Sequence, residues 1–247
     1  NMRKKKKKDK NSVCEKCGRT LFVFTENGPV PCECREEHLK RQRLKSARIP
    51  PRYVNKSIST FKGKDKKRRE LRNDANLYVK QFSPESEGPY KKGFLYMGPT
   101  GCGKSHLATG ILKAIIEKGY TGYYCNVVDF FAKLRDTYGG DTAYDEMDMI
   151  DRVNSVDFLV LDDLGAEKPS AWMRDRLYAV VNRRYESNLP ILVTTNKTDV
   201  VELEEHVGKR IVSRLCEMCV IVDNFPDDDY RMMDLDEQMR RSIRKRR

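Results

Sequence analysis

The stretch that decides the fold is GFLYMGPTGCGKSHL, residues 93–107. Gly98, Gly103, Lys104 and Ser105 satisfy the spacing G-x-x-x-x-G-K-S, a short apolar run precedes them, and a helical pattern follows. Glycines allow backbone N–H groups to wrap around phosphate oxygens, and the start of a helix adds partial positive charge. The stretch therefore predicts a strand, a phosphate-binding loop and a helix, in that order.

The ligand that this loop predicts is ATP with Mg²⁺. Lys104 is expected to reach the β and γ phosphates, and Ser105 to bind Mg²⁺. His106 follows on what we expect to be the surface of the helix. Contacts to the nucleotide are expected from the whole loop and this next residue: Gly98, Pro99, Thr100, Gly101, Cys102, Gly103, Lys104, Ser105 and His106.

A second stretch, FLVLDDLGAEK at residues 158–168, places two aspartates after four apolar residues. A strand that is apolar at every position is buried on both faces, as in a parallel sheet covered by helices, and ligands bind at the carboxyl ends of such strands. We expect Asp162 to hold the Mg²⁺ shell and Asp163 to orient or deprotonate the attacking water. An aspartate at this second position reaches less far than a glutamate, so slow hydrolysis is expected.

Two later motifs add candidate polar groups. PILVTTN, residues 190–196, predicts a third strand, after which Asn196 is placed to sense the γ-phosphate, although an asparagine after a strand is often only a turn residue. In GKRIVSRL, residues 208–215, Arg210 and Arg214 share one helix face because they are four residues apart. They are either a solvated pair or an arginine finger that enters the ATP site of a neighbouring subunit, which requires an oligomer.

The N-terminal region holds four cysteines in one C-x₂-C pair and one C-x-C pair: Cys14, Cys17, Cys32 and Cys34. Between the pairs, LFVF and the turn ENGP predict a hairpin that brings them together. Four thiolates in this layout predict a zinc-ribbon-like module, in which the metal supplies folding free energy that so small a module lacks. The alternatives are that His38 replaces Cys34 as a ligand, or that the cysteines are unrelated.

Composition bounds the class of protein. The chain has 247 residues and a net charge of +12, with 38% hydrophobic and 35% charged residues, enough for one large domain or for one domain and a small module. Residues 1–60 hold 17 Lys and Arg against 6 Asp and Glu, whereas residues 94–230 carry a net charge of −8. Basic ends suggest a nucleic-acid partner, although the lysine run at residues 4–8 is equally a solvated tail.

The same composition excludes other classes. No apolar run approaches the roughly 18 residues of a membrane helix, and no signal peptide is apparent, so we expect no membrane partner and a cytoplasmic location. Eight cysteines in such a chain favour metal binding or free thiols over disulfides.

Five motifs occur in a characteristic order: GPTGCGKSHL, LVLDDLGAE, NRRYESNLPILVTTN, RIVSRL and DDDYR. Together they resemble the ATPase domain of bacterial and phage helicase loaders of the DnaC/DnaI type, and of the related IstB-type transposition helper ATPases. The resemblance covers roughly residues 49–231. It implies an α/β fold, an AAA+ P-loop ATPase domain with a five-stranded parallel sheet behind the zinc module.

The resemblance also implies partners and residue roles. It implies homo-oligomerisation on ATP binding, contact with single-stranded DNA, and an N-terminal region that grips a replicative DnaB-type helicase. The roles it assigns are Walker B for Asp162 and Asp163, sensor 1 for Asn196, the arginine finger for Arg214 with Arg210 beside it, and a position near the nucleotide for Arg231.

The expected organisation has four parts. Residues 1–48 form a basic tail, the zinc module and a basic helix; residues 49–93 a linker and lead-in helix; residues 94–230 the ATPase domain; and residues 231–247 a basic C-terminal tail. Two other functions stay open: a transposition helper ATPase, whose partner is a transposase, and a weakly hydrolysing, ATP-dependent DNA-binding adaptor. The zinc module favours the loader.

Overall fold

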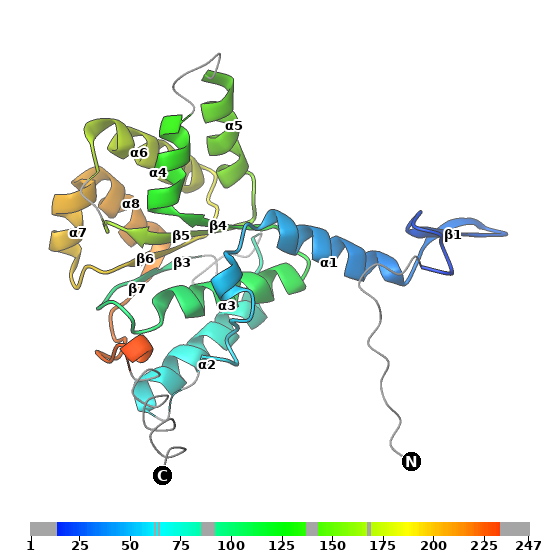
Figure 1. The fold of residues 1–247 in the computed structure, drawn as a ribbon, viewed down its shortest axis with the longest axis horizontal. Coiled ribbons are helices and arrows are strands. Elements are labelled where there is room, and N and C mark those ends of the chain that lie inside the picture. The colour runs from blue at the N-terminus through cyan, green and yellow to red at the C-terminus, as the bar shows by residue number, and fades with distance from the viewer. Residues whose placement is uncertain are drawn as a thin grey trace, which may run out of the picture.

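A five-stranded parallel sheet organises the larger part of the molecule (Figure 1). The computed structural model describes residues 14–61, 63, 65–84, 92–136, 143–166 and 169–232; the lysine run at 4–8 and most of the basic C-terminal tail lie outside them. The strands stand in the order β4-β5-β6-β3-β7, and all neighbours are parallel, which confirms the predicted sheet. Their bounds are β3 Gly93–Tyr96, β4 Gly122–Asn126, β5 Phe158–Leu164, β6 Ile191–Thr195 and β7 Cys219–Val222.

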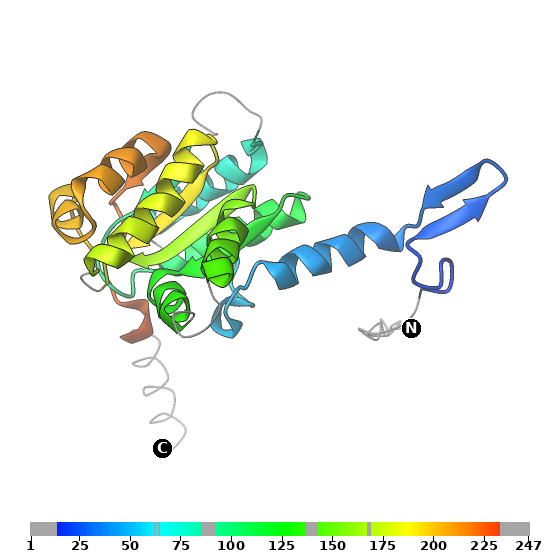
Figure 2. The same ribbon diagram turned by 90° about the horizontal axis from the view of Figure 1, so that it is seen from above.

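Helices cover both faces of this sheet, as the unbroken apolar strands require (Figures 1 and 2). On one face Phe94 and Val160 pack against α2 and α3; on the other Leu95 and Leu161 pack against α4 to α8. The helices are α2 Lys66–Gln81, α3 Lys104–Glu117, α4 Val127–Asp136, α5 Ala143–Asn154, α6 Ala171–Glu186, α7 Val200–Val207 and α8 Lys209–Met218. Among the described residues, no helix is both long and apolar enough to cross a lipid bilayer.

Helix α1 (Cys34–Ser46) projects away from this body and carries a two-stranded hairpin at its far end (Figures 1 and 2). The hairpin consists of β1 Phe22–Thr25 and β2 Gly28–Pro31, an antiparallel pair where the sequence predicts one. The C-terminal half of α1 contacts the body. Lys40 forms an ion pair with Glu117 of α3 at 3.2 Å, Ala47 just after the helix is fully buried, and the Ala47 carbonyl oxygen accepts the Tyr124 N–H at 2.8 Å. The short 3-10 helix η1 (Pro51–Tyr53) then leads towards α2.

The strand order determines where ligands can bind. β3 lies between β6 and β7, with β5 on the other side of β6. The loop after β3 therefore emerges beside the end of β6, which Asn196 follows, and near the end of β5, which contains Asp162 and Asp163. In open α/β sheets the crevice at such a change in strand order is the usual ligand site. The fold therefore brings the separate motifs of the sequence to one edge of the sheet.

Candidate nucleotide-binding site

The loop between β3 and α3 has the backbone that phosphate binding requires. Gly98, Gly101 and Gly103 have φ angles of 135°, 84° and 104°, which only glycine adopts without strain. At Gly103 a Cβ atom would also lie 2.6 Å from Cε2 of Phe61, so space as well as conformation demands glycine there. The loop ends at the N-terminus of α3, whose free N–H groups and dipole favour an anion.

Lys104, the first residue of α3, is buried against this loop, with an exposed fraction of 7%. Its Nζ donates to the carbonyl oxygens of Gly98 at 2.7 Å and Pro99 at 2.6 Å. The thiol of Cys102 also donates to the Pro99 carbonyl, at 3.0 Å. These bonds fix the loop and hold the ammonium group at its centre.

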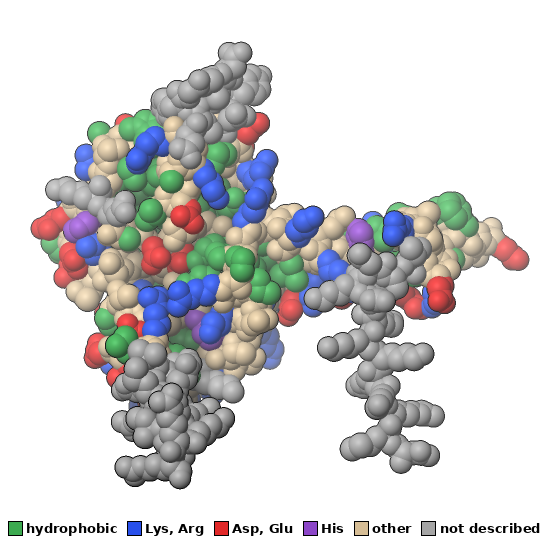
Figure 3. Space-filling model, in the orientation of Figure 1, with side chains coloured by type: hydrophobic (Ala, Val, Ile, Leu, Met, Phe, Trp, Pro, Cys, Tyr) green, Lys and Arg blue, Asp and Glu red, His purple; other side chains and the backbone are tan. Residues whose placement is uncertain are grey.

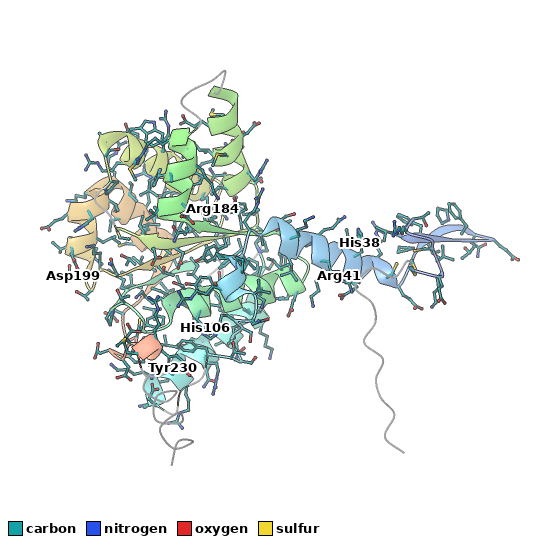
Figure 4. All side chains as sticks on the ribbon, viewed as in Figure 1. His38, Arg41, His106, Arg184, Asp199 and Tyr230 are labelled. Carbon is teal, nitrogen blue, oxygen red and sulfur yellow. The ribbon has the colours of Figure 1, made fainter. Side chains whose placement is uncertain are left out.

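A cavity of about 220 Å³ opens over the loop. The cavity is lined by the loop and by three side chains that the sequence analysis singled out, namely Asp163, Asn196 and Arg231. It also takes in residues that the sequence did not single out: Arg52, Lys56, Arg68 and Tyr230. Figure 3 shows basic side chains gathered on this face around the His106 imidazole, which Figure 4 labels together with Tyr230. A cavity with glycine N–H groups and basic side chains suits a polyphosphate.

The two adjacent aspartates have different surroundings. Asp162 is 1% exposed, and its oxygens accept the hydroxyl groups of Tyr124 and Thr194, the latter at 2.7 Å. Asp163 is exposed and lines the cavity, at a φ of 63° where β5 leaves its regular register with β6. The Asn126 amide donates to its carboxylate at 3.3 Å, and the Asp163 N–H donates to Thr194 Oγ1 at 3.0 Å.

The surroundings of Asp163 also change the pKa of its carboxyl group. Partial shielding of the carboxylate from water by the walls of the site, followed by the neighbouring Asp162 carboxylate, raises the pKa of Asp163, while Lys104 and Arg231 oppose that rise. The same two cations therefore influence this carboxylate from the loop and from the C-terminal segment. A carboxylate with a raised pKa at the mouth of a cavity is suited to accept a proton from water.

The sequence analysis placed His106 on the surface of α3, but the structure shows that its side chain contacts another segment of the chain. Its Nε2 lies 3.1 Å from the Ser57 carbonyl oxygen and 3.0 Å from Thr60 Oγ1, and its ring meets the Phe61 ring edge-on at 5.5 Å. Burial lowers the pKa of His106. The imidazole therefore fastens the lead-in segment to the start of α3, and the segment forms one wall of the cavity.

The DDDYR segment, residues 227–231, lines another side of the cavity. The Tyr230 N–H donates to the Gly101 carbonyl oxygen at 3.2 Å, and the Arg231 N–H donates to Asp229 Oδ1 at 2.9 Å. Arg68 on α2 lies 3.5 Å from the Asp228 carboxylate. Arg68 stands in a basic stretch that looks like an ordinary solvated helix, so no signal in the sequence marks it.

Arg210 and Arg214 do not reach this cavity. Both guanidinium groups lie over the ring of Tyr178 on α6, at 4.5 and 4.8 Å from its centroid. Arg214 also donates from Nε to Asn182 Oδ1 at 2.8 Å. The structure therefore keeps the pair together on the α6–α8 side of the molecule, away from the chain's own loop.

The four N-terminal cysteines converge at the base of the hairpin. Their sulfur atoms all lie within 4.8 Å of one another, with Cys14 to Cys32 at 3.8 Å and Cys17 to Cys34 at 3.4 Å. A tetrahedral site with Zn–S bonds of about 2.3 Å places its sulfurs about 3.8 Å apart, so the set fits one zinc ion. The backbone N–H groups of Cys17 and Lys16 lower the pKa of Cys14 to about 7, whereas the contact with the Cys17 thiol raises the pKa of Cys34 to about 12. The support for a metal site is therefore the convergence of the four sulfur atoms.

The alternative ligand His38 is not part of this cluster. It lies one turn along α1 (Figure 4), and its Nε2 is 2.8 Å from Gln42 Nε2 on the same helix. The other cysteine pair, Cys216 and Cys219, straddles the end of α8 and the start of β7 without further candidate ligands among the described residues. The metal hypothesis therefore rests on the four N-terminal thiols.

A family model for IstB-like ATP binding proteins matches residues 36–235. The chain belongs to the IstB-like ATP-binding protein family. Its relatives include the replicative helicase loader DnaC of Escherichia coli (strain K12), 25% identical over 205 residues that cover 81% of each chain. The replicative helicase loader DnaI of Bacillus subtilis (strain 168) is 23% identical over 180 residues, which are 72% of this chain and 56% of that relative.

Solved structures agree. A crystal structure of the DnaC helicase loader is 30% identical, with a TM-score of 0.60 over 70% of this chain and 98% of that one. The crystal structure of DnaI is 26% identical, with a TM-score of 0.61 over 71% and 94% of the two chains. AMPPCP-bound DnaA from Aquifex aeolicus, at 20% identity and a TM-score of 0.57, shares the fold. This IstB-like protein is thus an ATP-binding P-loop protein of the AAA+ type, and its resemblance to helicase loaders is confirmed.

Proposed function

We propose that this protein is an ATP-dependent helicase loader, which binds a replicative DnaB-type helicase and helps to place it on single-stranded DNA in the cytoplasm. The observation that carries the proposal is the similarity to relatives named as replicative helicase loaders, one of which is matched over 81% of both chains. The match extends over the lead-in segment and the ATPase domain together, so it reaches beyond the phosphate loop that many nucleotide-binding proteins have in common.

The zinc module is the proposed helicase-binding part. It stands at the far end of α1, away from the ATPase body, so a partner could contact it separately from that body (Figure 2). Its hairpin exposes apolar side chains, with Phe24 78% and Val30 42% exposed. Apolar side chains exposed on a hairpin are suited to bury against a partner surface. The four cysteines would hold Zn²⁺, which supplies the folding free energy of the hairpin.

The proposed chemistry is slow ATP hydrolysis at the cavity. Lys104 and the loop N–H groups would bind the phosphates, and Ser105 and Asp162 would hold Mg²⁺, which neutralises phosphate charge when bound. Asp163 would orient the attacking water and accept its proton, and Asn196 would contact the γ-phosphate. Arg231, which influences Asp163 from the C-terminal segment, would stabilise the nucleotide.

Homo-oligomerisation on ATP binding is the proposed role of the arginine pair. Because Arg210 and Arg214 lie away from their own cavity, they would act on the ATP site of a neighbouring subunit. The Tyr178 ring contacts both arginine side chains at the surface of α8, and Asn182 accepts a hydrogen bond from Arg214. An arginine that enters a site only on assembly makes hydrolysis depend on the oligomer.

Native mass spectrometry with the host's replicative helicase, with and without ATP and Mg²⁺, tests the proposal. A discrete, ATP-sensitive complex with a helicase hexamer is the expected result, and the same spectrum reports zinc as a mass increment. A zinc-loaded protein that ignores the helicase would overturn the loader proposal. The family description IstB-like ATP-binding protein favours the transposition helper as second candidate, for which a transposase and duplex DNA are the partners to test.

A further inference from the structure

Tyr124 contributes to the candidate site although the cavity walls do not include it. Its hydroxyl donates to Oδ2 of Asp162, while the Thr194 hydroxyl donates to Oδ1 at 2.7 Å. The two donors come from the strands on either side of β5, so the carboxylate is held from both flanks. With an exposed fraction of 1%, Asp162 has little freedom to turn away from these bonds.

The direction of the tyrosine bond follows from the two groups that form it. A carboxylate oxygen accepts hydrogen bonds, whereas a phenol hydroxyl carries a proton at neutral pH, so Tyr124 donates and Asp162 accepts. The two hydroxyl donors replace water around the buried carboxylate and fix the direction of its oxygens. A divalent cation binds oxygen ligands in a defined geometry, so an oriented carboxylate suits it.

Tyr124 also contacts the seat of α1. Its backbone N–H donates to the Ala47 carbonyl oxygen at 2.8 Å, and its ring lies 5.8 Å from the Tyr53 ring on η1, centroid to centroid. Ala47 follows directly on α1, which carries the hairpin. One residue therefore joins the base of the projecting helix to the carboxylate at the strand end.

We propose that Tyr124 is a positioning residue for the magnesium shell: its hydroxyl orients the Asp162 carboxylate, and its backbone and ring tie that carboxylate to the seat of α1. The proposal rests on the proposed role of Asp162 at Mg²⁺. Tyr124 does not touch the nucleotide, so its loss changes the Mg²⁺ requirement and leaves metal-free nucleotide affinity intact. A movement of the segment around Ala47 and Tyr53, at the end of α1, would therefore shift the Asp162 carboxylate through Tyr124.

Tyr124→Phe, compared with Tyr123→Phe, tests the positioning role. Tyr123 is the preceding residue of β4, is half-buried, and packs on the opposite face of the sheet. ATP binding to the full chain is titrated with Mg²⁺ and, separately, in EDTA. We expect Tyr124→Phe to raise the Mg²⁺ concentration for half-maximal binding about tenfold, the loss of one hydrogen bond to a charged group, with affinity in EDTA unchanged. Tyr123→Phe should match the wild type.

An unchanged Mg²⁺ requirement in Tyr124→Phe would overturn the proposal. Asp162→Asn tests the proposed magnesium site itself. If Asp162→Asn raises the Mg²⁺ requirement and Tyr124→Phe does not, the magnesium site stands and only the inference about Tyr124 fails. Neither titration depends on a helicase complex. If Tyr124→Phe does not fold, hydrogen exchange of the wild-type chain provides a second test. Mg²⁺ added to the ATP complex should slow exchange of the Tyr124 amide, and an unchanged rate would contradict the link to α1.

Discussion

The ammonium group of Lys104 hydrogen-bonds the carbonyl oxygen of Gly98 at 2.7 Å, so the loop encloses its own cation. Backbone carbonyl dipoles stabilise a charge that burial would otherwise destabilise. The same geometry centres the ammonium under the cavity where phosphates are proposed to bind. Lys104 thus organises the loop and provides its charge.

Replacing Lys104 by alanine should therefore weaken ATP binding by about tenfold to a hundredfold, the range for losing charge-assisted hydrogen bonds. Isothermal titration calorimetry measures the affinity. Lys133→Ala on α4, an exposed lysine outside the cavity, is the matched control and should bind as the wild type does. Equal affinities in the two variants would contradict the assignment of the phosphate site.

Asp163→Asn should retain ATP binding but lower the turnover number by about a hundredfold, because the amide cannot accept a proton from water. A phosphate-release assay with the helicase present measures this. Asp175→Asn, on the exposed face of α6, is the control. Equal and negligible rates in wild type and Asp163→Asn would instead favour the non-hydrolysing adaptor.

Arg214→Ala should leave ATP affinity of the isolated chain unchanged and abolish ATP-dependent assembly and turnover, because the side chain lies away from its own cavity. Lys209→Ala, exposed on the same helix, is the control. Mixing Arg214→Ala with Lys104→Ala should restore part of the activity, since each supplies the group that the other lacks. Loss of ATP affinity in isolated Arg214→Ala would contradict a role in a neighbouring subunit.

Chelation of zinc should unfold the hairpin and leave the nucleotide site intact. In the hairpin module, the cysteine residues Cys17 and Cys32 are buried, whereas most other side chains are half-buried or exposed, so little apolar burial holds the module together. Native mass spectrometry should show one zinc per chain, lost in Cys32→Ser and retained in Cys216→Ser. Full zinc content in Cys32→Ser would exclude the four-cysteine site.

Arg184→Met should lower the free energy of unfolding by about 3 kcal/mol, because buried acceptors lose their donor. Arg184 is fully buried (Figure 4 labels it) and donates to five carbonyl oxygens, among them Pro190 at 2.8 Å and Val156 at 3.1 Å. The adjacent Arg183 forms an exposed ion pair with Asp151, so Arg183→Ala should cost less than about 1 kcal/mol. Urea denaturation compares the two.

The contiguous motifs predicted much of this architecture. The glycine spacing of the loop encodes left-handed backbone conformations, and the apolar run of β5 encodes burial on both faces, so the strand, loop and sheet were predictable. The two cysteine pairs around a turn likewise predicted the hairpin that gathers four thiols. Each of these signals depends only on residues that are close together in the chain.

Tertiary structure alone decided which distant side chains meet. Tyr124 reaches Asp162 because β4 pairs with β5, His106 meets Ser57 because the lead-in segment folds over α3, and Tyr230 meets Gly101 because the chain returns after β7. Strand order and register set these contacts, and they depend on how whole faces pack. A local spacing cannot encode them, because the same pattern of apolar residues is compatible with several strand orders.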